Sequence, residues 1–479
     1  MKIEIRKLDR NRWCIPKTGP MRVPGLIFSS DSLISDIQAD QSLVQVANVA
    51  TLPGIVGRSL AMPDIHWGYG FPIGGVAAFD LEEGVISPGG VGYDINCGCR
   101  LMTTALDAHE IRPFIRDLVS NLFQNVPSGV GSRGPLHLSP KQLRQVSVQG
   151  AAWAVKHGYG EPSDLERIED RGAMEGADPT VLSERAFKRG ADQLGTLGSG
   201  NHFLEIQVVD KIYDPEKARA FGLREGGVTV FIHSGSRGFG HQICDDFLKL
   251  MAADLQKSSL VLPDRQLACA PLASDPGRKY FAAMACAANY AWANRQILMH
   301  WARETFLHVL SISPRDLRMN LLYDVCHNIA KKETHRVDGS DMPLCVHRKG
   351  ATRSLPPGHK LLPRIYASTG QPVLIPGDMG TFSYVLAGAE GAMRETFGSS
   401  CHGAGRALSR SQALKQAKGR AINRELEDRG IIVQSRGKKT LKEEMPEAYK
   451  NVSDVVGVVH ETGLATKVAR LRPLGVIKG

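Results

Sequence analysis

The chain has 479 residues, of which 42% are hydrophobic and 23% are charged, and this ordinary globular balance excludes a disordered, collagenous or disulfide-scaffold protein. Lys and Arg number 59 against 49 Asp and Glu, so the net charge of +10 favours a polyanionic partner. The 50 glycines are an excess that predicts many sites where the backbone turns sharply or approaches another group closely.

The sequence carries features of a cytoplasmic protein. The first ten residues, MKIEIRKLDR, include acidic residues and no apolar run, so we predict no signal peptide. No stretch approaches the ~18 continuous apolar residues of a membrane helix, and we expect no membrane association. Nine cysteines, several beside histidines, indicate buried or metal-bound thiols in a reducing compartment.

Hydrophobic periodicity predicts a mixture of strands and helices. In chain order, these are a strand at 228–233, helices at 242–256 and 280–310, a strand at 372–375, a helix at 407–429 and a strand at 431–433. Gly430 is the expected end of the last helix. Because strands and helices do not alternate regularly, we predict an α+β fold.

The polar motifs are spread from about residue 63 to the C-terminus, and no long linker divides the chain. We therefore expect residues 1–479 to form one large catalytic unit. Residues 133–170 carry no motif that indicates a role.

Five side chains have the chemistry of metal ligands. Asp94 and Cys97 lie three residues apart and offer a hard oxygen and a soft sulfur, a mixture that suits Mn, Fe, Co or Zn. His202, His233 and His327 each lie at the end of a strand-like segment. Each histidine alone is more simply a core residue, but together the five fit a dinuclear site with positions open for substrate oxygens. Cys99 is interpreted as a core residue.

Two glycine-rich segments have the composition of phosphate-binding loops. Residues 234–238 (SGSRG) offer backbone N–H groups, hydroxyls and the guanidinium of Arg237. Residues 403–406 (GAGR) bring Gly403, Ala404, Gly405 and Arg406 just before a predicted helix, whose N-terminus favours anions. No GxxxxGK[ST] motif is present, which excludes a P-loop NTPase.

His402 differs from the other histidines because it follows Cys401 and precedes a glycine-rich turn and a basic helix. A neutral imidazole beside two cations and a triphosphate is a candidate nucleophile at phosphorus. Its far nitrogen then needs an acceptor, and Asp64 is a candidate. His66 is equally consistent with a structural role and with a place near the metals.

Two other classes of protein explain part of this pattern. A metal-dependent RNA phosphodiesterase or nuclease accounts for the ligands and the basic charge, but not for His402. A non-enzymatic, RNA-binding structural protein with a zinc site is the other alternative, and it predicts no exposed coordination position and no dependence on nucleotide.

The motifs together resemble the RtcB-type RNA ligase family, which joins 3′-phosphate RNA ends in splicing and repair. The resemblance rests on a set of motifs that occur in the family's order over almost the whole chain: MPDIHWGYGFPIGGVAAFD from Met62, GVGYDINCGCRL from Gly90, GSGNHFLE from Gly198, HSGSRGFG from His233, CHNIAKKE from Cys326, HRKGATR from His347, PGDMGTFSYVLAG from Pro376, SSCHGAGR from Ser399 and LRPLGVIKG from Leu471.

The resemblance implies a role for each matching residue. It implies one large domain with mixed or antiparallel sheets and surrounding helices, two Mn²⁺ ions bridged by Cys97, and His402 as the residue that accepts GMP from GTP. The residues that it assigns to the nucleotide are Asn201, Phe203, Glu205, Asp378, Ser383, Tyr449 and Lys478. Those that it assigns to phosphate or RNA are Arg237, Lys349 and Arg410, with Arg406 of the loop beside them.

The resemblance also implies the reaction and its partners. Family members join an RNA 3′-phosphate or 2′,3′-cyclic phosphate to a 5′-hydroxyl through a histidine–GMP and an RNA(3′)pp(5′)G intermediate. The implied substrates are tRNA halves or damaged RNA, and the small activator protein archease assists some members.

Overall fold

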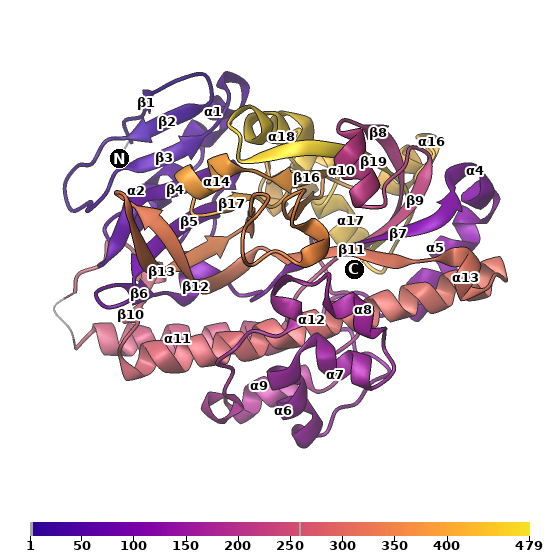
Figure 1. Cartoon of the computed structure of the whole chain (residues 1–479), viewed down its shortest axis with the longest axis horizontal. Coiled ribbons are helices and arrows are strands. Elements are labelled where there is room, and N and C mark those ends of the chain that lie inside the picture. The colour runs from indigo at the N-terminus through magenta and orange to yellow at the C-terminus, as the bar shows by residue number, and fades with distance from the viewer. Residues whose placement is uncertain (1–2, 258–259) are drawn as a thin grey trace.

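Two large twisted sheets form the centre of the computed structural model, which describes residues 3–257 and 260–479 (Figure 1). The first sheet has the order β1-β2-β3-β4-β5-β13-β12 and is antiparallel except for the pair β3 and β4. Its strands are β1 (Arg6–Lys7), β2 (Arg12–Ile15), β3 (Gly25–Phe28), β4 (Ile55–His66), β5 (Ile73–Asp80), β12 (Asn328–Val337) and β13 (Ser340–Lys349).

The second sheet has the order β11-β7-β9-β8-β19-β16-β15, and β18 pairs in parallel with β19. Its strands are β7 (Gly98–Asp107), β8 (Phe203–Ile212), β9 (Gly227–Ser234), β11 (Asn320–Cys326), β15 (Pro372–Ile375), β16 (Ser383–Gly388), β18 (Ile432–Ser435) and β19 (Ala465–Lys478). Two short ribbons pair β6 (Val85–Ile86) with β10 (Ala270–Pro271), and β14 (Ala351–Arg353) with β17 (Ser399–Cys401). The mixed sheets with surrounding helices confirm the α+β prediction.

A helix of 36 residues, α12 (Asp275–Leu310), runs along the second sheet and carries much of the main core (Figure 1). The Ser274 hydroxyl accepts from the Gly277 N–H and caps its start, and Ser311 in the left-handed region ends it. Apolar residues lie on most sides of α12, as expected of a helix buried in a large protein. It contacts α5 (Ile115–Asn125), α6 (Pro140–Gln149), α7 (Ala151–Lys156) and α11 (Arg237–Leu255).

The remaining helices lie around the sheets. They are α1 (Asp31–Ala39), α2 (Ser42–Val49), α3 (Pro88–Val91), α4 (Ala108–Ile111), α8 (Pro162–Leu165), α9 (Glu184–Gly190), α10 (Pro215–Ala220), α13 (Pro314–Leu317), α14 (Glu390–Glu395), α15 (Arg410–Gln416), α16 (Ile422–Asp428), α17 (Lys438–Glu443) and α18 (Val452–Glu461). Among the described residues, no helix combines the length and the apolar character needed to cross a membrane.

Most predicted elements are present, and one is wrong. The strands at 228–233 and 372–375 are β9 and β15, the strand at 431–433 is β18, and the helix at 280–310 is the body of α12. The helix predicted at 242–256 begins earlier, at Arg237. The single helix predicted at 407–429 is two helices, α15 and α16, because Gly419 adopts a φ of +80° between them.

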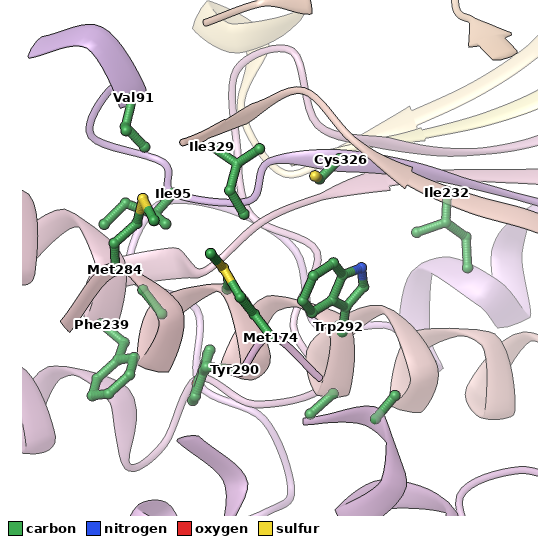
Figure 2. Close-up of a cluster of buried hydrophobic side chains, with 14 of the residues drawn as sticks. Val91, Ile95, Met174, Ile232, Phe239, Met284, Tyr290, Trp292, Cys326 and Ile329 are labelled. Atoms are coloured by element: carbon green, nitrogen blue, oxygen red, sulfur yellow. The ribbon is translucent and has the colours of Figure 1, made fainter. Parts of the chain in front are cut away.

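Trp292 fills the space between α12 and the strands above it, near Cys326 and Ile232 (Figure 2). Its side chain is fully buried, whereas Trp67 is 61% exposed. We predict that Trp292→Ala lowers the free energy of unfolding by ~3–5 kcal/mol, because the lost burial leaves a cavity. Trp67→Ala is the matched control and should change it by less than ~0.5 kcal/mol. Urea unfolding followed by circular dichroism measures both, and equal losses would contradict this account of the core.

Candidate functional site

Two strands of the second sheet begin, and two neighbouring strands end, at one edge of the sheet, where they bring the predicted metal ligands together. Cys97 directly precedes β7, His202 directly precedes β8, His233 lies near the end of β9, and His327 directly follows β11. The register pairs Cys99 and Phe203 with His233 on either side of β9. Residues more than 200 positions apart in sequence therefore meet at one sheet edge, as predicted for a single site.

The donor atoms of these residues form a continuous chain. The His202 Nε2 lies 2.8 Å from an Asp94 oxygen and 3.3 Å from the Cys97 sulfur. That sulfur lies 3.2 Å from the His233 Nε2, which is 3.2 Å from the His327 Nε2. Cys97 is central in this chain, with Asp94 and His202 on one side and His233 and His327 on the other.

The protonation states fit a cation site. The His202 Nδ1 donates to the Leu197 carbonyl at 3.0 Å, so Nε2 is the nitrogen that faces the Asp94 carboxylate and the Cys97 sulfur. Burial lowers the pKa of His233 and of His327, so both rings are neutral, as metal ligands must be. Burial disfavours the charge on Asp94, but the His202 ring and Arg237 outweigh it and lower the pKa of that carboxyl.

Unpaired polar atoms point to the same conclusion. The Asp94 Oδ1 is buried and has no hydrogen-bond partner among the described residues. Two imidazole nitrogens facing each other at 3.2 Å, as in His233 and His327, gain little unless a cation or proton lies between them. The carboxylate, thiol and three imidazoles therefore fit borderline divalent metals.

Cys99 belongs both to the apolar core and to a second metal-capable group. Its side chain is fully buried in a cluster with Leu101 and Phe231, as expected of a core residue. Its sulfur also lies within 4.8 Å of donor atoms of His233 and His327, so it forms a second metal-capable group with them.

His402 is held against the metal-capable cluster by Asp64. Its ring centroid lies 4.8 Å from that of His327. The His402 Nδ1 donates to the Asp64 Oδ2 at 2.6 Å, and the same oxygen accepts from the backbone N–H of His402 at 2.9 Å. A carboxylate at Nδ1 fixes the tautomer that carries its lone pair on Nε2. The predicted contact between Asp64 and His402 is therefore present.

Gly405 and Lys450 both contact the backbone around Asp64. Gly405 has a φ of +74°, and a Cβ there would lie 2.2 Å from the Asp64 carbonyl oxygen, so the loop passes too close for a larger residue. The Lys450 ammonium donates to the carbonyls of Pro63 at 3.3 Å and Ile65 at 2.5 Å. Burial lowers the pKa of Lys450 to about 8, against the attraction of Asp64. No sequence motif indicates a role for Lys450, which lies between a tyrosine and an asparagine in an ordinary polar segment.

A second group of predicted residues forms a pocket beside the cluster. The Glu205 carboxylate accepts from the Gln207 amide at 2.7 Å, and that amide also donates to the Ser383 hydroxyl at 3.1 Å. The Lys478 ammonium lies 5.6 Å from the centre of the Phe203 ring. Burial raises the pKa of Glu205 to about 8, although Lys478 opposes it.

Tyr449 and Arg406 meet at Glu444, a buried residue that motif reasoning missed. The Tyr449 hydroxyl and the Arg406 guanidinium both donate to the Glu444 carboxylate, and the guanidinium lies over the Tyr449 ring. Asp378 accepts from the Gly380 N–H at 2.8 Å and the Thr381 hydroxyl at 2.6 Å. Its carboxylate is therefore engaged within its own turn.

The glycine-rich loops lie where the motifs place them, with one difference. Residues 234–238 lead into α11, which has Ser236 at its N-cap. Gly235 packs so closely that a Cβ would lie 2.4 Å from the Asp94 carboxylate. Residues 403–406, however, do not lead directly into a helix, because α15 begins only at Arg410 and its cap is Ser409.

The predicted residues line one cavity of about 810 Å³. Asp64 and Ser383 are the exceptions: Asp64 lies behind His402, and Ser383 behind Glu205 and Gln207. The predicted residues on the wall are Asp94, Cys97, Asn201, His202, Phe203, Glu205, His233, Arg237, His327, Lys349, Asp378, His402, Gly403, Ala404, Gly405, Arg406, Arg410, Tyr449 and Lys478.

Lys349 differs from the other basic residues of the cavity. Its ammonium is buried and donates to the carbonyls of Tyr69, Phe71 and Gly89. Burial lowers its pKa to about 7. The predicted contact of Lys349 with phosphate or RNA would therefore compete with these carbonyls.

Sequence reasoning missed several residues of the cavity wall. The side chains of Tyr69, Tyr93 and His241 form an aromatic row, with ring centroids 5.4 Å and 4.7 Å apart, and Arg189 and Gln193 lie on the same wall. Tyr69 and Tyr93 lie within the quoted motifs, but neither residue type alone indicates a function.

Comparisons with known proteins agree with this site. The family described as "tRNA-splicing ligase RtcB" matches residues 45–479. The proteins named tRNA-splicing ligase RtcB from Thermococcus kodakarensis and Archaeoglobus fulgidus are each 56% identical to this chain, over 100% and 99% of it and 99% of their own lengths. The protein of that name from Methanococcus maripaludis is 52% identical over the full length of both chains.

A sheet-edge site of this kind with these matches defines the chain as an RNA ligase. It belongs to the tRNA-splicing ligase RtcB family, and the resemblance inferred from the motifs is confirmed.

The central place of Cys97 makes metal binding testable. We predict that Cys97→Ala loses Mn²⁺ or Co²⁺, since its sulfur lies between the two groups of ligands. Cys286→Ala is the control, because Cys286 is an equally buried free thiol on α12. Metal analysis after dialysis measures both, and equal metal content in the two variants would refute the assignment.

Proposed function

We propose that this protein is a GTP-dependent RNA ligase that joins RNA 3′-phosphate or 2′,3′-cyclic phosphate ends to 5′-hydroxyl ends. One observation carries the proposal: His402, with its Nδ1 held by Asp64, adjoins the metal-capable cluster in the cavity that also contains the Glu205 pocket. A metal-dependent nuclease accounts for the metal ligands but gives no role to the Glu205 pocket in the same cavity.

His402 is the nucleophile of the first step. Because its Nδ1–H donates to Asp64, its Nε2 lone pair is free to attack the α-phosphorus of GTP. A nitrogen–phosphorus bond forms, the bond to the β-phosphate oxygen breaks, and pyrophosphate leaves. Asp64 stabilises the positive charge that develops on the ring.

The RNA ends react in the next two steps. An oxygen of the RNA 3′-phosphate attacks the histidine-bound GMP, which regenerates His402 and forms RNA(3′)pp(5′)G. The 5′-hydroxyl then attacks the 3′-phosphorus, GMP leaves and the hydroxyl proton is lost. A 2′,3′-cyclic phosphate is first hydrolysed to the 3′-phosphate.

Asp94, Cys97, His202, His233 and His327 would hold two Mn²⁺ ions. When bound, these ions neutralise the charge on the phosphoryl oxygens. Gly403, Ala404 and Gly405 offer backbone groups to the nucleotide phosphates, and Asn201 lies beside them on the cavity wall.

The Glu205 pocket selects guanine. A carboxylate accepts two hydrogen bonds from guanine N1–H and the N2 amine, and the Lys478 ammonium donates to O6 or N7. Phe203 and Tyr449 supply apolar surface to the base. Adenine offers no matching pair of donors, so GTP is preferred over ATP.

The basic residues of the cavity contact RNA. Arg237, Arg406 and Arg410 lie on the wall, and the net charge of +10 favours a phosphate backbone. We propose tRNA halves or damaged RNA as substrates, a cytoplasmic location, residues 1–479 as one catalytic unit, and archease as an activator.

Covalent labelling tests the first step. We predict that incubation with α-³²P-GTP and Mn²⁺ labels the protein through an acid-labile, alkali-stable bond. His402→Ala should abolish the label, and Asp64→Asn should slow labelling at least about 100-fold, because an amide can hold the wrong tautomer. His460→Ala, on α18 and outside the cavity wall, should label normally. Absence of label with every divalent metal would refute the proposal.

The pKa of Glu205 predicts a pH dependence. In the empty pocket burial raises this pKa to about 8, and the carboxyl must lose its proton to accept both guanine donors. The affinity of the metal-free protein for guanosine should therefore rise up to about tenfold per pH unit between pH 6 and 8, then level off.

Glu205→Gln should bind guanosine more weakly and without this slope, and calorimetry in EDTA measures both proteins. Guanosine is the probe because it has no phosphate group that titrates in this range and brings no metal ion. A pH-independent affinity of the unmodified protein would contradict the role of Glu205.

A further inference from the structure

Helix α12 passes directly under the metal-capable cluster and presents two consecutive buried polar residues to it. Asn294 and Arg295 are fully buried, in the middle of a helix that is otherwise largely apolar. Neither residue belongs to a recognised motif, and neither lines the cavity. Both side chains are directed at the backbone that carries the metal ligands.

All five N–H groups of the Arg295 guanidinium are used. Two donate to the Asp324 carboxylate, both at 2.8 Å. Two donate to the backbone carbonyls of Asn96 at 2.7 Å and Ser234 at 2.9 Å, and the fifth to the Asn96 side chain at 2.9 Å. Asn96 precedes Cys97, Ser234 follows His233, and Asp324 lies on the strand that ends before His327.

Asn294 supports the segment that positions His202. Its carbonyl accepts from the N–H groups of Gly195 at 2.8 Å and Thr196 at 3.1 Å, and its amide donates to the Thr196 carbonyl at 3.0 Å. This turn leads to Leu197, whose carbonyl fixes the His202 ring. The Asn294 amide also reaches Gly235 at 3.2 Å, so it joins the His202 side to the His233 side.

These contacts add to what the sheet provides. His233 is paired with Cys99 and Phe203, and the His327 N–H donates to the Cys97 carbonyl at 2.8 Å. The carbonyls of Asn96 and Ser234 beside these ligands accept from Arg295. Asn96 has a φ of +51°, a conformation that a non-glycine residue keeps only when its surroundings fix it. Besides Arg295, the Ala288 carbonyl of α12 holds its side chain at 2.8 Å.

We propose that Asn294 and Arg295 are positioning residues that set the spacing of the two groups of metal ligands. Arg295 fixes Cys97 relative to His233 and His327, and Asn294 fixes His202 relative to His233. The inference rests on the metal centre of the proposed function. Both residues act through the segments that carry the ligands, and neither lines the cavity.

The experiment compares two arginine variants on the same helix. Arg295→Lys keeps the buried charge but cannot make five fixed hydrogen bonds. Arg303→Lys is the matched control, because Arg303 also donates to a carboxylate with its two terminal nitrogens, to Asp164 at 2.9 and 3.0 Å. Its Nε donates to the Met319 carbonyl at 2.9 Å, and among the described residues no hydrogen bond joins it to a metal-ligand candidate or its chain neighbours. Asn294→Ser is the second variant, with a side chain too short for the turn at Gly195.

The probe is Co²⁺, whose sulfur-to-metal absorption reports the Cys97 contact and whose visible bands report coordination number. Arg295→Lys and Asn294→Ser should bind Co²⁺ about 10–100-fold more weakly with altered bands, and guanosine in EDTA with unchanged affinity. Arg303→Lys should change the melting temperature without changing Co²⁺ binding.

Wild-type spectra and affinity in both folded test variants, or an equal loss in Arg303→Lys, would overturn the inference. If Arg295→Lys does not fold, Asn294→Ser alone decides. If the unmodified protein binds neither Co²⁺ nor Mn²⁺, the proposed metal centre itself fails and the inference with it, which is a different result from unequal variants.

Discussion

The carboxylate of Asp324, buried between the guanidinium groups of Arg100 and Arg295, joins the parts of this structure that carry chemistry. Arg100 lies on β7, Asp324 on β11 and Arg295 on α12, with contacts of 2.7 and 2.8 Å and no exposure of the three side chains. Removing one partner of such a buried pair costs about 3–5 kcal/mol, since a charge is left without compensation. This buried interaction therefore connects the sheet edge and its ligands to α12, and breaking it destabilises the fold.

The cavity above this network contains groups that are poorly satisfied without a ligand. Burial raises the pKa of Glu205 and of the Cys97 thiol, and lowers the pKa of His233 and His327. Each shift marks a group that gives up solvation in the folded protein and regains favourable contacts only when a cation or a base binds. Holding these donors and acceptors in place without a ligand lowers the stability of the folded protein, which is typical of catalytic sites.

Much of the site was predictable, because its reactive residues lie in short segments of distinctive sequence. The segment around His402 and the segment with Asp94 and Cys97 each contain residue types whose neighbours limit their function. The residues that support them were not predictable in the same way. Asn294 and Arg295 look like ordinary positions of a long helix, and Lys450 like a solvated lysine, because their partners are backbone carbonyls far away in the sequence. The helix predicted at 407–429 was wrong for a related reason: α15 and α16 bury apolar residues in one cluster, so the periodicity runs on across the break.

The sequence alone determined the family, the α+β class, the metal-capable residues and His402, because these depend on residue types and local spacing. For Cys97 and Asp64 the sequence offered candidates, and the tertiary structure supplied the geometry: the Cys97 sulfur lies between two groups of ligands, and the Asp64 carboxylate holds the Nδ1 of His402. The tertiary structure alone decided that α12 supports the ligand-bearing backbone. These are relations between segments tens to hundreds of residues apart. They follow from the order of strands in the second sheet and from the packing of α12 beneath it, which local patterns do not encode.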